Sequence, residues 1–135
     1  MTPLTANRYT KFRDGLITAH PVKAAANIYK GSLVCAGTDG YAVPGADATG
    51  YTFLGVALEE ADNTNGQSGD LLVRVQTQGV FSFGKSGTIT QANIGANVYV
   101  VDDQTVGLAA TTTYDVLCGR LEALDGTDLW DRIAV

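Results

Sequence analysis

The sequence predicts a small, mainly β protein, an antiparallel barrel or sandwich that follows an extended N-terminal arm. Three observations predict this fold class. The apolar runs are short, Gly, Asp or Asn residues separate them about every 8–12 residues, and the clearest run alternates with a period of two. A chain of 135 residues is long enough to bury one apolar core without a metal or a disulfide.

The first part of the predicted β region contains three strands, at 28–36, 41–43 and 51–58. Each is an apolar run bounded by turn-forming residues. Gly31 breaks the first run, and the Asp39-Gly40 pair is a hairpin signal before the second. Gly55 inside the third run predicts a β-bulge, because glycine tolerates the backbone conformation that a bulge imposes.

The segment 70–78 has the alternation of a half-buried strand. One face carries Leu72, Arg74, Gln76 and Gln78, and the other carries Leu71, Val73, Val75 and Thr77. Gly79 then redirects the chain into the next strand. Further strands are expected at 80–83, 97–101, 105–108, 116–124 and 129–135. Short helical segments are expected only at 22–29 and 90–93.

Residues 1–23 are expected to form the arm and residues 24–135 a single β domain, because the arm shows neither a period of two nor a helical stripe. The arm has a net charge of +3 and the remaining 112 residues a net charge of −8. Such an arm suits an acidic partner, and a frayed, solvated tail is the alternative. Aromatic side chains among the bases are typical interface anchors. The candidate contact residues are Arg8, Tyr9, Lys11, Phe12 and Arg13.

Composition and charge argue against several classes of protein. No apolar run approaches the ~18 residues of a membrane span, and the first residues lack the apolar core of a signal peptide. A pI of about 4.6 argues against general nucleic-acid binding, which needs clustered basic side chains. Cys35 and Cys118 lie in apolar runs and are expected to be buried free thiols.

Residues 79–86 match the pattern G-x-x-x-x-G-K-[ST] of phosphate-binding loops. That loop requires a helix that starts at the lysine, so that backbone N–H groups surround the phosphate. Here Val80, Phe81 and Phe83 alternate as in a strand, and no helix signal follows Ser86. The segment is therefore predicted to be a strand that ends in a turn, and we expect it to bind no nucleotide.

Other candidate sites are weaker. The acidic cluster at 59–62 does not have the spacing of a calcium loop and is expected to be a solvated turn. The single histidine, His20, precedes a proline in the expected arm, so no nucleophilic triad is predicted. Trp130 is expected to lie in the core or in an interface. We therefore expect no enzyme activity, no metal and no cofactor.

Five short segments follow one another in a characteristic order: IYKGSLV at 28–34, FLGVA at 53–57, GVF at 79–81, IGANVYV at 94–100 and CGRLE at 118–122. In this order they resemble the small capsid cement, or decoration, proteins of tailed bacteriophages. The resemblance covers roughly residues 28–135 and leaves the arm outside.

The resemblance implies a structural role. Proteins of this family bind the outer surface of an assembled icosahedral shell, at or near three-fold positions and often as trimers, and clamp neighbouring coat subunits. It implies a homotrimer on the virion surface, present in the host cytoplasm during assembly, whose partner is the major capsid protein. It implies no direct contact with nucleic acid or membrane. Many copies on one lattice convert modest contacts into high avidity.

Three other functions stay open. A carbohydrate- or host-surface-binding β module of a phage fibre would need exposed aromatic side chains on loops. A nucleotide-binding enzyme rests on the Gly84-Lys85-Ser86 match alone. A minor capsid or tail-tube component shares the β class and the lack of a catalytic motif.

Overall fold

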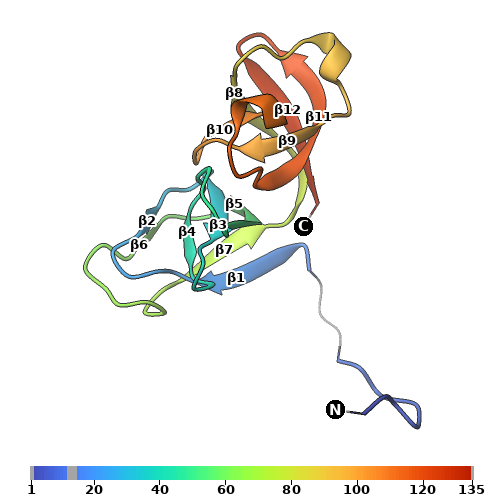
Figure 1. Cartoon of the computed structure of the whole chain (residues 1–135). Helices are drawn as coiled ribbons and strands as arrows, with labels where there is room; N and C mark the ends of the chain where they lie inside the picture. The colour runs from blue at the N-terminus through green and yellow to red at the C-terminus, as the bar shows by residue number, and fades with distance from the viewer. Residues whose placement is uncertain (1, 12–14, 135) are drawn as a thin grey trace.

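The computed structural model describes residues 2–11 and 15–134. It is mainly β, as predicted, and Figure 1 shows two β units stacked on each other. The first, here the sheet unit, contains β1 (Ile17–Pro21), β3 (Leu33–Ala36), β4 (Ala42–Pro44), β5 (Thr52–Ala57) and β7 (Leu72–Gln76). These strands are antiparallel in the order β1-β7-β5-β3-β4. Beside them, β2 (Asn27–Ile28) pairs with β6 (Ala61–Asp62).

The second unit is a closed barrel of β8 (Gln78–Ser86), β9 (Asn97–Val100), β10 (Thr105–Gly107), β11 (Leu117–Asp125) and β12 (Asp128–Ala134). The strand order is β10-β8-β12-β11-β9, and β9 pairs with β10 to close the ring. Only the β8–β10 pair in this ring is parallel. Closure gives each strand two neighbours, which removes the free edges through which strands of different molecules pair. Two 3-10 turns are η1 (Gln91–Asn93) and η2 (Ala109–Thr111).

Strand β3 contributes to two apolar cores at once. Leu33 and Cys35 belong to the core that the two units share, whereas Val34 points to the other face of the sheet. All three side chains are fully buried. The shared core also contains Val43, Phe53 and Val56 from the sheet unit and Phe83, Val98, Val100, Val106, Leu121, Leu129 and Ile133 from the barrel. The second core contains Val22, Ile28, Val34, Ala42, Val73 and Val75.

Two glycines allow strands to bend where the units are built. Gly55 in β5 has a φ of +148°, and the register with β3 shifts beside it, which confirms the bulge predicted there. Gly119 in β11 has a φ of +145°, and the register with β9 shifts there too. A Cβ atom on Gly119 would lie 2.5 Å from the Arg132 carbonyl oxygen and would also overlap the Asp131 carboxylate. Only glycine fits this position.

Most strands predicted from the sequence are confirmed, apart from small shifts at their ends. The run at 28–36 is two strands, because Gly31 turns the chain with a φ of +85°. The helix predicted at 22–29 is wrong. Asn63 explains why, since its amide donates hydrogen bonds to the carbonyl oxygens of Val22 at 3.3 Å and Lys23 at 3.0 Å. In a helix, these carbonyl oxygens would instead accept hydrogen bonds from backbone N–H groups four residues later.

Strand β1 was not predicted because it lies at the edge of the sheet unit. It pairs with β7 alone over its length, and only its Thr18 and His20 side chains lie on the buried face, where they are half-buried. Its other face carries Ile17, which is 49% exposed. Because the half-buried side chains of this strand are polar, its sequence lacks the alternation of apolar and polar residues that predicts a strand.

We predict that Gly119→Ala destabilises the protein by about 3 kcal/mol or more, because the new Cβ meets backbone and its φ is unfavourable for alanine. Urea denaturation followed by circular dichroism measures the free energy of unfolding. Gly15→Ala is the matched control, since Gly15 has open space around its Cβ position. Equal stabilities of the two variants would contradict this account of β11.

Candidate functional site

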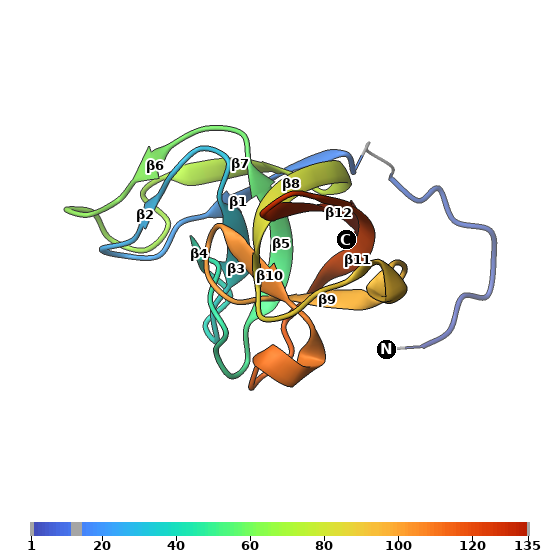
Figure 2. The ribbon, with the colours of Figure 1, turned by 90° about the horizontal axis from the view of Figure 1, so that it is seen from above.

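The N-terminal arm runs away from both units in the two views of Figures 1 and 2. Residues 2–11 are all exposed, and the Tyr9 side chain is 92% exposed. Arg8, Tyr9 and Lys11 thus lie close together on one exposed stretch of chain. Within the described residues, no hydrogen bond or ion pair ties these three side chains to the body. The other predicted contact residues, Phe12 and Arg13, lie outside the described residues.

The folded body begins before the predicted boundary of the arm at residue 23. The Thr77 hydroxyl donates a hydrogen bond to the Gly15 carbonyl oxygen at 2.5 Å, and the Thr77 N–H donates to the Leu16 carbonyl oxygen at 2.9 Å. β1 follows directly, and Val22 is fully buried. The last third of the predicted arm is therefore part of the sheet unit. Its residues 17–21 pair with β7 and complete the backbone hydrogen bonds on the outer edge of that strand.

The segment that matches a phosphate-binding loop is a strand, as predicted. It forms β8, in which Lys85 is half-buried and lies opposite Val106 of β10. The next helical turn, η1, starts only at Gln91 and is three residues long. No helix N-terminus of the described chain therefore stands at Lys85 to hold a phosphate.

Two of the acidic residues at 59–62 have structural partners. Glu59 accepts two hydrogen bonds from the Arg74 guanidinium, at 3.3 and 3.2 Å, and Asp62 accepts one from the Thr64 N–H at 3.0 Å. Across residues 2–11 and 15–134, no three His, Cys, Asp or Glu side chains lie close enough together to hold a metal ion. Neither helical turn in this part of the chain is long or apolar enough to cross a membrane.

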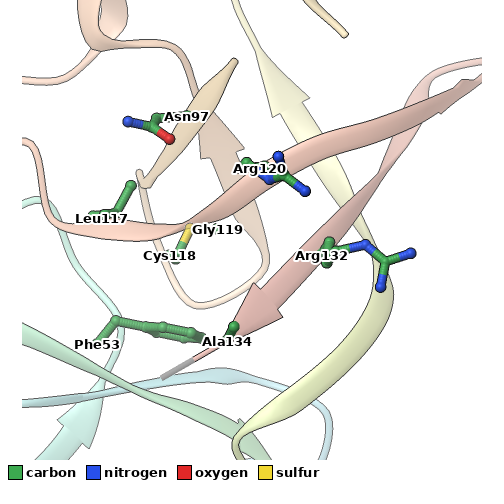
Figure 3. Close-up of a pocket in the computed structure, with 8 residues that line it drawn as sticks. All are labelled: Phe53, Asn97, Leu117, Cys118, Gly119, Arg120, Arg132 and Ala134. Carbon is green, nitrogen blue, oxygen red and sulfur yellow. The ribbon is translucent and has the colours of Figure 1, made fainter. Parts of the chain in front are cut away.

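A cavity of about 300 Å³ lies where β11 and β12 separate (Figure 3). The register between these strands ends at the pair Arg120–Arg132, although β11 begins at Leu117 and β12 continues to Ala134. Phe53 of β5 reaches the same space from the sheet unit. The cavity therefore combines an apolar wall from both units with two basic side chains.

The two arginines at this cavity lie directly opposite each other across β11 and β12. Arg132 donates two hydrogen bonds to the Glu122 carboxylate, at 3.0 and 2.8 Å. These bonds, together with the nearby charge of Arg120, lower the pKa of Glu122. Arg120 itself has no ion pair with any described residue. Two arginines and one glutamate leave the rim with one net positive charge, and the like charges of the two paired arginines repel each other.

Asp131 lies behind the cavity, inside the barrel, and is fully buried. Neither of its carboxylate oxygens has a hydrogen-bond partner in the described chain. The nearby Cys118 thiol donates instead to the Val98 carbonyl oxygen at 3.5 Å. Burial raises the pKa of Asp131 to about 7, because the charged form has lost its hydration. The same cause raises the pKa of the Cys118 thiol, and the two predicted free thiols are indeed buried.

The cavity was not predicted, because β5 and β9, which complete its walls, lie far in the sequence from the hairpin of β11 and β12. Two signals were nevertheless present. The predicted turn at 125–127 places Arg120 and Arg132 nearly symmetrically about a hairpin. The alternation in the last strand puts Asp131 on the same face as Leu129 and Ile133, which points it into the barrel. Trp130 consequently lies on the outer face, where it is 37% exposed.

Asp131 makes the stability of the protein depend on pH. The folded state keeps the proton up to about pH 7, whereas the unfolded chain releases it near pH 4, so stability falls as pH rises between these values. The difference corresponds to about 4 kcal/mol. We predict that Asp131→Asn gains stability relative to the native protein by up to this amount between pH 4 and pH 8.

Urea titrations at several pH values measure this dependence. Asp128→Asn is the control, because it makes the same substitution at an exposed carboxyl at the start of the same strand. A constant difference between the native protein and Asp131→Asn across this pH range would show that Asp131 is ionised in the fold.

A comparison of the chain with protein-family models, curated proteins and solved structures found no match. Function is therefore inferred from the arm, the cavity and the sequence motifs themselves.

Proposed function

We propose that this protein is a structural virion component that binds the outer surface of an icosahedral phage capsid. It stabilises the shell by linking neighbouring major capsid protein subunits. The observation that carries the proposal is the exposed basic arm, in which Tyr9 lies between the bases Arg8 and Lys11 and has no contact partner on the body. The order of the five sequence segments at 28–122 supports a capsid as the partner.

Charge and apolar surface have different tasks in this arm. Exposed ion pairs contribute only ~0–1 kcal/mol each, so Arg8 and Lys11 mainly steer and orient the arm toward an acidic surface. A buried aromatic anchor contributes more, on the order of 2 kcal/mol. Because ordering the arm costs free energy, a single contact is modest, and many copies on one shell supply the avidity.

The arm can be tested by truncation. We predict that deleting residues 2–14 leaves the body folded and weakens its binding to expanded shells, as measured by co-sedimentation. The truncation must stop before Gly15. Deletion of the whole predicted arm, residues 1–23, would also remove β1 and the fully buried Val22 and would therefore destabilise the sheet unit.

Paired variants separate the two contributions of the arm. Tyr9→Ala with Phe12→Ala is expected to reduce shell binding more than Arg8→Ala with Lys11→Ala at moderate salt, because salt already screens the exposed charges. Unchanged binding of the 2–14 deletion would identify the arm as a solvated tail and would remove the main support for the proposed function.

A capsid site on a three-fold axis favours a partner with three-fold symmetry. We predict that the protein forms a trimer, which analytical ultracentrifugation at micromolar concentration measures. Sedimentation as a monomer alone under these conditions would exclude a preformed trimer.

A further inference from the structure

We propose that the cavity between β11 and β12 binds an extended segment of a partner protein. An apolar side chain of that segment enters the cavity, and an acidic side chain two residues away, on the same face of the segment, pairs with Arg120. This contact lies on the body and is separate from the arm. It does not require the partner to be a capsid protein.

The size and lining of the cavity suit one apolar side chain. Its volume of about 300 Å³ is at the lower end of the range for ligand pockets, which is about 300–1,000 Å³. Phe53 and Leu117 form its apolar side, and Leu117 is 52% exposed although it is a large apolar residue. In Figure 3 these two side chains lie across the cavity from the two arginines. A bound apolar group would cover Leu117 and remove it from water.

The positive charge at the rim favours a partner segment that carries an acidic side chain close to the apolar side chain in the cavity. Glu122 pairs directly with Arg132 and is attracted to Arg120 only without a direct contact, so these three side chains together carry one net positive charge on a chain whose net charge is −5. Asp131 does not compensate it. That side chain points into the barrel from β12, whereas Arg120 lies on the outer face of β11 and is exposed. A carboxylate from outside would relieve the repulsion between the paired arginines and accept a charge-assisted hydrogen bond.

The shape of the site favours an extended chain over a compact molecule. β11 and β12 continue past their last paired residues and diverge, so the cavity is flanked by two strand ends, at Leu117 and at Ala134. A partner segment in β conformation can lie along such an opening while alternate side chains point into it. The arm of a second copy does not suit the site, because Arg8 and Lys11 would add positive charge beside Arg120.

The test uses a blocked five-residue peptide with leucine at its second position and aspartate at its fourth, and the same peptide with asparagine in place of the aspartate. We expect the aspartate peptide to shift the amide NMR signals of Gly119, Arg120 and Ala134 in the full chain. Arg120→Gln should weaken this binding by up to about fivefold, the range of an exposed ion pair. Lys30→Gln is the matched control, since Lys30 is another exposed base of the body without an ion pair in the described chain.

Each other outcome overturns the proposal. Equal binding of the two peptides would show that Arg120 does not select an acid. Absence of shifts at several millimolar peptide would show that no such segment binds. Binding of free phenylacetate without binding of the peptide would identify a pocket for small carboxylic acids instead. Because shells are not used, these results are independent of the test of the arm.

Discussion

Burial of β3 on both of its faces is the constraint on which the rest of the structure depends. Leu33 and Cys35 fill the core shared with the barrel, and Val34 fills the second core on the other side of the sheet. Full burial of an apolar side chain of this size stabilises a fold by about 1.5–3 kcal/mol. Because β3 is part of the sheet unit and also supplies the shared core, the barrel cannot move away from β3 without exposing the apolar side chains of that core to water.

This arrangement leaves the periphery for interactions. The barrel is closed and its interior is filled by side chains, so partners meet only the outer surface, where the arm and the opening between β11 and β12 lie. Both carry positive charge on an otherwise acidic chain. Arg8 and Lys11 lie on an exposed, extended segment, and Arg120 lies at a fixed position on the body. A partner with acidic segments would be recognised by both, which would bind it in one orientation.

The sequence was most informative where burial is one-sided. The alternation at 70–78 correctly separated Val73 and Val75 from the exposed Arg74, and glycine inside an apolar run correctly predicted the bulge at Gly55. Tertiary contacts decided the remaining elements. β1 is a strand because β7 offers it an edge, and residues 22–29 are not helical because Asn63, about 40 positions later, binds their carbonyl groups. The cavity depends on where two paired strands diverge, which no local pattern specifies.

The placement of the two cysteines gives each unit its own chemical reporter. Cys35 lies in the sheet unit and Cys118 in the barrel, and both thiols are buried in the shared core. Burial raises the pKa of Cys35 to about 11 and also raises that of Cys118, so neither thiolate forms readily while the core is closed. Reaction with a thiol reagent therefore requires an opening of the fold, and its rate at each cysteine reports how often that unit opens. Equal rates would mean that the two units open together.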